Sequence, residues 1–284
     1  MQPIVIASVF GGIGNQLFCW ATGFATARRL RARLVLDCRS YSQDAFGRTY
    51  MLPQLGIDAE CIHSPSLLER ATLPLFSHLA EIKKGFLRLP GIAYYADPGG
   101  ALNHELLDAH TASRSYLRGY WQSADYFNEY DNEIRQSVTF QSCIRRRTPE
   151  NSVCVHIRSF KEVSSQARNV LDRSFYESAY SRCRRRIGQP HFIVYTDDLA
   201  WAQNENLLPD SYELGWNHHT RSCPNHDLCD LITMSSFQNL IIANSTFSWW
   251  AAYLTNEGAW ISAPSPERQC WYSEHPLPSF WERL

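Results

Sequence analysis

The stretch from Asn239 to Leu254, NLIIANSTFSWWAAYL, most constrains how this chain can fold. It begins with an apolar run, Leu240 to Ala243, of the kind found in a fully buried strand. Asn244, Ser245 and Thr246 interrupt this run with side chains that bond their own backbone and cap helices. An aromatic-rich, helix-forming segment follows. The pattern predicts a βα unit whose helix begins at the hydroxyl-bearing turn.

The same turn has the properties of an anion site. Free backbone N–H groups at a helix start, together with the helix dipole, favour a negatively charged guest. Ser245, Thr246 and Ser248 add hydroxyl groups there, and phosphate is the guest that we expect. An ordinary capped helix without a ligand explains the pattern equally well, because such caps are common. This stretch alone leaves both interpretations open.

Length and composition place the chain among ordinary globular proteins. Its 284 residues suit one large or two medium domains, and 44% hydrophobic with 19% charged residues supply enough apolar material for a core. A net charge of −1 gives no indication of a general nucleic-acid binder. The N-terminus predicts a first strand rather than a signal peptide. Nine cysteines, an odd number without a CxxC pair, favour free thiols in a reducing compartment.

A second strand–loop–helix pattern opens the chain. Ile4 to Phe10 predicts a strand, Gly11 to Gly14 a glycine-rich loop, and Gln16 to Leu30 a helix with apolar residues at helical spacing. The loop reads GGxGN rather than GxGxxG and lacks the P-loop lysine, so it is a weak nucleotide signature. Asn15 and Gln16 bring neutral hydrogen-bonding side chains of the type that sugar hydroxyls prefer.

The middle of the first half has weaker signals. Residues 39–112 predict loops and helices separated by prolines. From Ser115 to Tyr126 we expect a strand followed by an aromatic turn. In that turn Tyr120, Trp121 and Gln122 either face a sugar or pack against the end of the strand, and the sequence does not choose between the two.

A basic, polar segment from Cys143 to Asn151 marks the expected domain boundary, which gives domains 1–150 and 151–284. The strand that follows ends in His156 and Arg158. Ligands of open α/β sheets bind outside the carboxyl ends of the strands, and alternation places these two side chains on one face. Arg158 offers a fork of donors suited to a diphosphate. A surface salt bridge is the alternative role for this arginine.

Two adjacent carboxylates follow the next expected strand, His191 to Tyr195. Asp197 and Asp198 could cap the following helix, accept from the edge of a guanine, or hold a metal ion. The metal interpretation ranks last, because the pair reads DD rather than DxD and no partner cluster of carboxylates accompanies it.

Four segments together resemble glycosyltransferase family 11, the α-1,2-fucosyltransferases. They are GGIGNQLFCWATGFATARRL, VCVHIRSF, FIVYTDDLAWAQ and DLCDLITMSSFQNLIIANSTFSWWAAYL, in family order over most of the chain. The resemblance implies an α/β fold of the GT-B type, two facing Rossmann-like domains with the active site in the cleft between them. Domain 1–150 would then hold the acceptor. Domain 151–284 would hold the GDP-sugar, with a C-terminal tail that packs back.

The resemblance also implies an activity. We expect an inverting, metal-independent transfer of L-fucose from GDP-fucose to the 2-hydroxyl of a galactoside-type acceptor glycan. GDP-fucose is the donor substrate, and no cofactor, metal or nucleic acid is expected. The alternatives are another GDP-deoxysugar donor, an inactive GDP-sugar-binding homologue, and a metal-dependent transferase. We expect a cytoplasmic protein without a transmembrane span, and leave open a peripheral contact with the inner face of the membrane.

Carried over residue by residue, the resemblance assigns catalytic roles to Arg158 and Asn15, with Glu162 as a candidate base. Ser159 and Lys161 stand where the family usually has a second arginine and an acidic residue. Lys161 could replace part of the missing charge, and Glu162, one position further, part of the missing carboxylate. Gln16 would lie with Asn15 in the loop that faces the reaction centre. The residues expected to bind the GDP-sugar are His156, Arg158, Asp197, Asp198, Asn244, Ser245, Thr246, Phe247 and Ser248.

Overall fold

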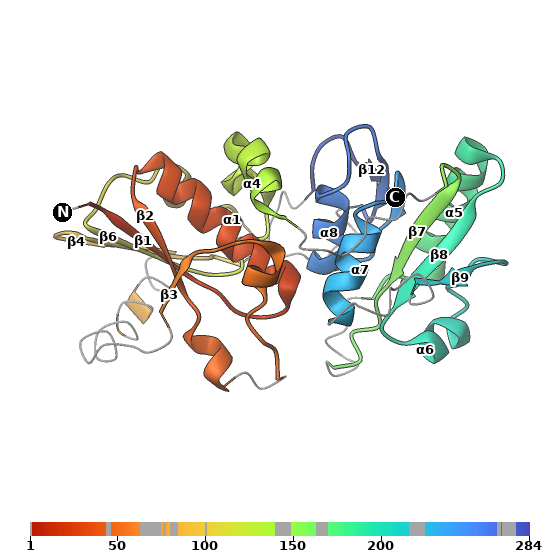
Figure 1. Ribbon diagram of the computed structural model, residues 1–284, viewed down its shortest axis with the longest axis horizontal. Helices are drawn as coiled ribbons and strands as arrows, with labels where there is room; N and C mark the ends of the chain where they lie inside the picture. The colour runs from red at the N-terminus through yellow and green to blue at the C-terminus, as the bar shows by residue number, and fades with distance from the viewer. Residues whose placement is uncertain are drawn as a thin grey trace. The chain divides into compact units, whose positions relative to one another are not determined.

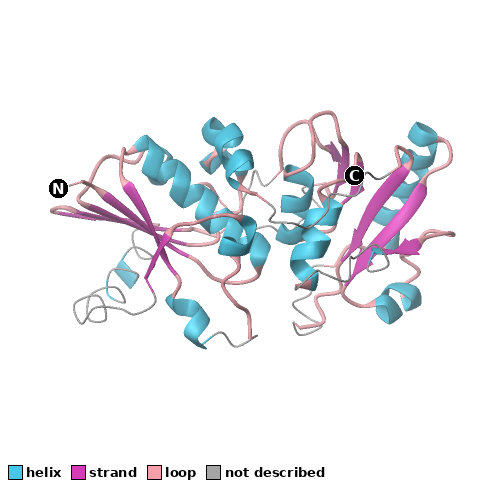
Figure 2. Cartoon of the chain, in the orientation of Figure 1, coloured by secondary structure: helices cyan, strands magenta, loops and turns pink. Residues whose placement is uncertain are grey.

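The computed structural model describes residues 2–43, 47–62, 75, 78–79, 85–99, 101–139, 149–162, 170–215, 225–265, 268 and 277–284. The chain divides into two compact units, residues 1–141 with 271–278 and residues 142–270 with 279–284. Each unit is built on its own six-stranded sheet with helices packed against it (Figures 1 and 2).

The first sheet has the strand order β3-β2-β1-β6-β5-β4 and is parallel except for the antiparallel pair of β4 and β5. Its strands are β1 (Ile4–Ser8), β2 (Arg33–Asp37), β3 (Glu60–Ile62), β4 (Phe86–Leu89), β5 (Ile92–Ala96) and β6 (Arg114–Arg118). The α-helices of this unit are α1 (Ile13–Arg29), α3 (His104–Leu107) and α4 (Asp131–Ser137), and short 3-10 turns are η1 (Arg39–Gln43), η2 (Leu52–Leu55), η3 (Ala124–Tyr126) and η4 (Asn128–Tyr130).

Helix α1 packs closely on the central strand of the first sheet. Val5 is fully buried and Ala7 is nearly so, as expected for a strand with neighbours on both sides. A Cβ atom at Gly23 would lie 2.7 Å from the Cβ of Ala7. A glycine at this position of the helix therefore lets α1 approach β1 directly, which holds the loop between them in place.

The expectation of loops and helices over residues 39–112 is wrong in part, because β3, β4 and β5 all lie there. These strands are 3, 4 and 5 residues long. Segments of this length give little periodicity, and each is stabilised mainly by pairing with strands distant in sequence. The β4–β5 hairpin turns at Pro90-Gly91, and Gly91 has a φ of +73°.

The second sheet has the order β12-β11-β10-β7-β8-β9, and all its pairs are parallel. Its strands are β7 (Ser152–Ile157), β8 (His191–Thr196), β9 (Glu213–Leu214), β10 (Asn239–Ile241), β11 (Trp260–Ala263) and β12 (Glu282–Arg283). The helices of this unit are α5 (Arg173–Ile187), α6 (Leu199–Asn204), α7 (His226–Met234) and α8 (Thr246–Tyr253).

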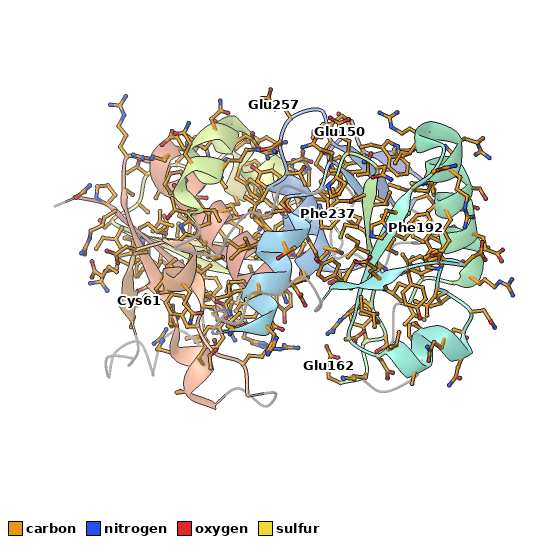
Figure 3. The ribbon with its side chains drawn as sticks, turned by 45° about the vertical axis from the view of Figure 1, so that its right-hand side comes forward. Cys61, Glu150, Glu162, Phe192, Phe237 and Glu257 are labelled. Atoms are coloured by element: carbon orange, nitrogen blue, oxygen red, sulfur yellow. The ribbon has the colours of Figure 1, made fainter. Side chains whose placement is uncertain are left out.

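Helices cover both faces of the second sheet. Figure 1 shows α5 and α6 on one side of β7 and β8, and α7 and α8 on the other. Phe192 belongs to the apolar cluster under α5, whereas Phe237 packs against Tyr195 on the opposite face (Figure 3). Six of the eight residues of α8 are buried, so this helix lies within the core rather than on its surface.

The cysteines differ in part from expectation. Cys19, Cys38, Cys61, Cys154 and Cys183 are free thiols. Cys229 in α7 is disulfide-bonded, so the expectation of free thiols is wrong at this position.

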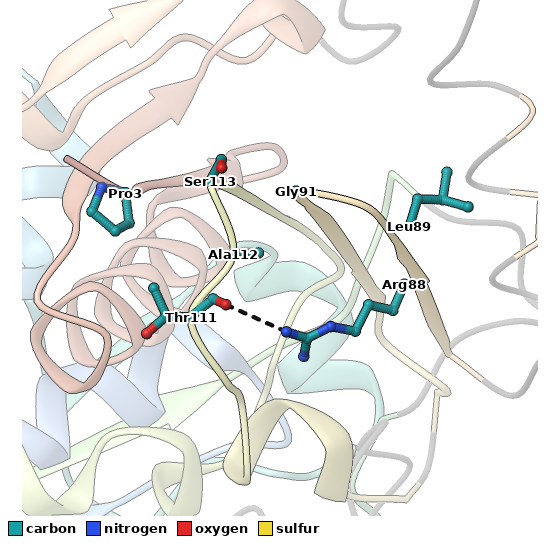
Figure 4. Close-up of a pocket in the computed structure, with 7 residues that line it drawn as sticks. All are labelled: Pro3, Arg88, Leu89, Gly91, Thr111, Ala112 and Ser113. Carbon is teal, nitrogen blue, oxygen red and sulfur yellow. Dashed lines mark hydrogen bonds between the residues drawn. The ribbon is translucent and has the colours of Figure 1, made fainter. Parts of the chain in front are cut away.

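Among the described residues, none of the helices is long and apolar enough to cross a membrane. A pocket of about 360 Å³ lies at the amino ends of β1 and β6, and Arg88 there donates to the carbonyl of Thr111 at 3.4 Å (Figure 4). Ligand sites of parallel sheets lie at the opposite, carboxyl edge.

Candidate functional site

The order of the second sheet reverses between β7 and β10. From β7 the chain proceeds outward through β8 to β9, and it returns on the other side of β7 with β10, followed by β11 and β12. A reversal of this kind opens a crevice at the carboxyl ends of the two neighbouring strands, where ligands of doubly wound sheets bind. Arg158 directly follows β7, and the turn of residues 244–248 follows β10. The fold thus brings two segments that are distant in sequence to one edge.

The turn after β10 is a capped helix start, as its sequence predicts. Ser245 is the N-cap of α8, and its hydroxyl accepts from the amide of Phe247 at 3.3 Å. The other first-turn amides have no partner within the helix and remain available to an anion. The hydroxyl of Ser248 is fully buried and donates to the carbonyls of Ala243 and Ser245, both at 3.3 Å. Ser248 therefore braces the turn from inside, while Thr246 is partly exposed.

Arg158 is held by two carboxylates. Its Nη1 donates to Oδ2 of Asp197 at 2.9 Å, and its Nη2 pairs with Glu162. The guanidinium also lies over the ring of Phe160, with 5.2 Å from its central carbon to the ring centroid. Glu162, labelled in Figure 3, lies in the same loop and is more exposed than Asp197. Asp197 is thus the more buried of the two partners of the arginine, and Glu162 is the more exposed one.

Ser159, which stands where the family usually has a second arginine, binds Asp197. The carboxylate accepts from the amide of Ser159 at 2.7 Å and from its hydroxyl at 2.8 Å. Burial alone would raise the pKa of Asp197, but the Ser159 amide, the charge of Arg158 and the Ser159 hydroxyl together lower it. Asp197 is therefore a fixed negative charge that ties the end of β8 to the loop after β7.

Asp198, the second carboxylate of the pair, has a different partner. It is the N-cap of α6, where its Oδ1 accepts from the amide of Trp201 at 3.0 Å. Helix capping was one of the three roles that the sequence left open. Within the described part of the chain, no group of three or more His, Cys, Asp or Glu side chains is arranged to hold a metal ion.

Two buried polar atoms at this edge have no hydrogen-bond partner among the described residues. They are Nδ1 of His156, near the end of β7, and Oδ1 of Asn244, just after β10. The His156 ring lies against the ring of Phe247 in α8, with centroids 5.8 Å apart. Buried polar atoms in proteins are nearly always paired. The hydroxyl of Tyr195, which lies opposite His156 on β8, is likewise unpaired, so this part of the unit holds several polar groups open to a further hydrogen bond.

His156 is uncharged at neutral pH. Burial, and next the positive charge of Arg158, lower its pKa from 6.5 to about 3. The imidazole therefore contributes hydrogen bonding but no charge, and Arg158 is the cation that follows this strand.

This lowered pKa predicts a loss of stability in mild acid. As the pH falls below 6.5, the unfolded chain protonates at His156, whereas the folded chain stays neutral down to about pH 3. The contribution of His156 to the free energy of unfolding is therefore fully present above pH 6.5 and is lost progressively as the pH falls from 6.5 to about 3. From pH 6.5 to 5 the free energy of unfolding of the second unit should fall by about 2 kcal/mol more than in a His156→Gln variant. Urea-induced unfolding of both proteins, monitored by hydrogen exchange at several pH values, measures this difference in the free energy of unfolding.

Equal slopes for wild type and His156→Gln would show that position 156 does not stay neutral in the folded protein.

In the first unit, the two neighbouring polar residues of the glycine loop have different surroundings. Gln16 is fully buried, donates to the carbonyls of Gly11 and Thr49, and accepts from the amide of Met51. It therefore ties the loop to residues 49–51 and does not face a ligand, contrary to expectation. Asn15 is partly exposed, and its Oδ1 accepts from Nε2 of Gln122 at 2.9 Å.

Two features of the Arg158 loop had no signal in the sequence. Ser159 binds Asp197, which is 38 residues away. Phe160 has a φ of +52°, a conformation that bulky residues rarely adopt and that is concentrated at functional sites. Both depend on the loop folding back over the end of β8, so only their three-dimensional neighbours reveal them.

Comparison with known proteins adds evidence on the family. The profile of Glycosyl transferase family 11 matches residues 99–269. An α-1,2-colitosyltransferase of Escherichia coli is 28% identical, over 100% of this chain and 99% of the relative. The mouse galactoside 2-α-L-fucosyltransferase Sec1 is 25% identical, over 87% of this chain and 63% of the relative.

Among solved structures, the crystal structure of the fucosyltransferase NodZ from Bradyrhizobium aligns with a TM-score of 0.52. The two are 14% identical, and the alignment covers 90% of this chain and 94% of NodZ. At this level of identity the similarity concerns the fold. Together with the two parallel sheets, it confirms the expected α/β fold of the GT-B type, with two Rossmann-like domains.

Proposed function

Because this chain belongs to glycosyltransferase family 11, a family of glycosyltransferases, we propose that it transfers L-fucose from GDP-fucose to the 2-hydroxyl of a galactoside-type glycan. We propose further that the transfer inverts the anomeric centre and needs no metal ion. The name of the mouse relative, a galactoside 2-α-L-fucosyltransferase, supports this choice of sugar and hydroxyl.

One observation carries the proposal. Arg158 and the capped turn of residues 244–248 lie at the carboxyl ends of β7 and β10, the two neighbours at the reversal point of the second sheet. A guanidinium fork and a helix N-terminus are each suited to phosphate oxygens. The unpaired Nδ1 of His156 and Oδ1 of Asn244 at the same edge leave two polar groups open to hydrogen bonds with a ligand.

The mechanism that we propose is a single displacement. The bond from the anomeric carbon to the β-phosphate oxygen breaks, the acceptor oxygen bonds to that carbon from the opposite side, and the hydroxyl proton leaves. Arg158 and the amides of the turn stabilise the negative charge that builds on the departing GDP. Breaking of the leaving-group bond is well advanced before attack, so a strong base is not required. Glu162 is the carboxylate proposed to accept the proton once the diphosphate has taken its place on Arg158.

Metal independence is supported by how the two aspartates are used. Asp197 receives three hydrogen bonds from Arg158 and Ser159, and Asp198 caps α6. A guanidinium and a helix start supply the positive potential that a divalent ion supplies in other transferases.

A second donor has support of its own. The E. coli relative that matches this chain over its whole length is named for colitose, the 3-deoxy form of fucose. A site that binds the 3-hydroxyl of fucose would reject colitose strongly, because its own polar groups would be left unpaired. A site without such groups would accept colitose, and the two donors therefore distinguish the two activities.

We predict GDP release from GDP-fucose when a β-galactosyl disaccharide is present, and equal rates with and without EDTA. GDP-fucose, GDP-colitose and GDP-mannose should be tested in parallel, with UDP-galactose as the control for the base. The product linkage is read by NMR, which also reports whether the anomeric centre has inverted.

Three results would contradict parts of this proposal. Turnover with GDP-colitose but not with GDP-fucose would show that colitose is the sugar transferred. Activity that disappears in EDTA and returns with Mn²⁺ would establish the metal-dependent alternative. Calorimetric binding of GDP without release from any GDP-sugar and acceptor would identify an inactive homologue.

A further inference from the structure

The first sheet has a reversal point of its own, between β1 and β6. The chain leaves β1 toward β2 and β3, and β6 lies on the other side of β1. The loop after β1 contains Gly11 and leads into α1, whose first turn carries Asn15, and the loop after β6 contains Gly119 to Ser123. The crevice geometry that marks ligand sites in such sheets therefore occurs in this unit as well.

An amide pair joins these two loops. Nε2 of Gln122 donates to Oδ1 of Asn15 at 2.9 Å, and the side chain of Gln122 is buried. A Cβ atom at Gly11 would lie 2.8 Å from Nδ2 of Asn15, so the amide of Asn15 lies directly over this glycine. Because Gln122 occupies the oxygen, the Asn15 group left to act on a ligand is the Nδ2 donor, which has no hydrogen-bond partner among the described residues.

The loop that holds Gln122 is strained and firmly anchored. Trp121 has a φ of +55°, although it is bulky and almost fully buried. Such a backbone conformation persists only where its surroundings impose it. Here Oδ2 of Asp97 accepts from the amides of Tyr120 and Trp121 at 3.1 and 2.9 Å. A Cβ atom at Gly119 would lie 2.0 Å from the Cβ of Asp97, so the chain bends around this carboxylate.

We infer that Gln122 is a positioning residue, which fixes the amide of Asn15 so that Nδ2 donates to an oxygen of the sugar substrate. The inference rests on the proposed function, and it gives Gln122 a role other than the direct sugar contact or strand-end packing that the sequence left open. Two neutral amides in fixed orientation suit the hydroxyl groups of a carbohydrate. Gln122 acts through Asn15, and the anchored turn around Asp97 keeps Gln122 in place.

The test uses Gln122→Glu, which preserves size and replaces the donor with a carboxylate. Asn15 must then rotate its Nδ2 toward the new carboxylate and present its oxygen to the sugar. With GDP-fucose and a β-galactosyl disaccharide at pH 7.5, kcat/KM should fall roughly tenfold to a hundredfold, as for other small displacements of a positioning group. As the pH falls toward 5, the introduced carboxyl regains a proton and can donate again, so the ratio to wild type should recover.

A double-mutant cycle separates positioning from general damage. In the Asn15→Ala background, Gln122→Glu should change kcat/KM less than about twofold, because its effect passes through Asn15. Gln54→Glu is the matched control, an exposed glutamine in the same unit whose replacement should leave kcat/KM unchanged. Calorimetric affinity for GDP should stay the same in all variants.

The outcomes distinguish the inference from the proposed function. A wild-type protein that transfers no sugar from any donor overturns both. If wild type is active, additive effects of the two substitutions, or a Gln122→Glu defect that does not change with pH, overturn the role of Gln122 and leave the transferase intact. Non-additivity together with recovery in acid supports it.

Discussion

Replacing Arg158 with alanine is expected to slow sugar transfer about 10²- to 10³-fold at saturating donor, roughly 3–4 kcal/mol of transition-state stabilisation. The guanidinium follows β7 at the reversal point of the second sheet, where the charge of the departing diphosphate would develop. Asp197 fixes one of its amino groups at 2.9 Å, so its position is already set before the donor arrives. Steady-state kinetics with GDP-fucose and a β-galactosyl disaccharide measure the effect.

Two variants sharpen this experiment. Arg158→Lys keeps the charge but loses the fork, so its rate should lie between wild type and Arg158→Ala. Arg173 in α5 forms an exposed pair with Glu177 at the same four-residue spacing as Arg158 and Glu162. Its replacement with alanine should leave the rate unchanged, because exposed pairs of this kind contribute little. Full turnover by Arg158→Ala would remove the basis of the proposed mechanism.

Gln16→Leu is expected to destabilise the first unit by about 2–4 kcal/mol, the largest structural effect that we predict. The substitution removes three hydrogen bonds at 3.1, 2.8 and 2.8 Å and leaves the buried amide of Met51 without a partner. A leucine of similar volume fills the space but makes none of these bonds. Hydrogen exchange of the amides in β1, β2 and β6 reports the change for this unit separately.

The second unit provides an internal reference, since its exchange rates and its affinity for GDP should not change. Gln54→Leu is the matched substitution, an exposed glutamine in the same unit with an expected change within about 0.5 kcal/mol. If Gln16→Leu unfolded with a free energy within that margin of wild type, its buried amide would not hold the glycine loop.

The two neighbours Asn15 and Gln16 show how far sequence reasoning extends. Both are amides in the first turn of α1, next to the glycine loop, and the residues alone gave them the same expected role. The structure buries Gln16 completely and leaves Asn15 partly exposed against Gln122, which is 107 residues away. Neighbouring residues of a helix point in different directions, so the two side chains meet different partners, which come from distant segments of the chain. The local sequence pattern does not reveal which segments those are.

The sequence by itself determined the elements that depend on neighbours along the chain. The strand, turn and capped helix of residues 239–254 formed where the apolar run, the hydroxyls and the aromatic segment predicted them. The strands Ser152–Ile157 and His191–Thr196 also formed, because short local sequence patterns predict buried strands and helix caps.

Only the tertiary structure decided which strands became neighbours and therefore which side chains meet. It placed β10 beside β7, so that Arg158 and the turn of residues 244–248 lie at one edge, and it paired Ser159 with Asp197. It also formed the short strands β3, β4 and β5, which the sequence did not reveal. The reason is that pairing between parallel strands, and the hydrogen bonds at their ends, join residues far apart in the chain.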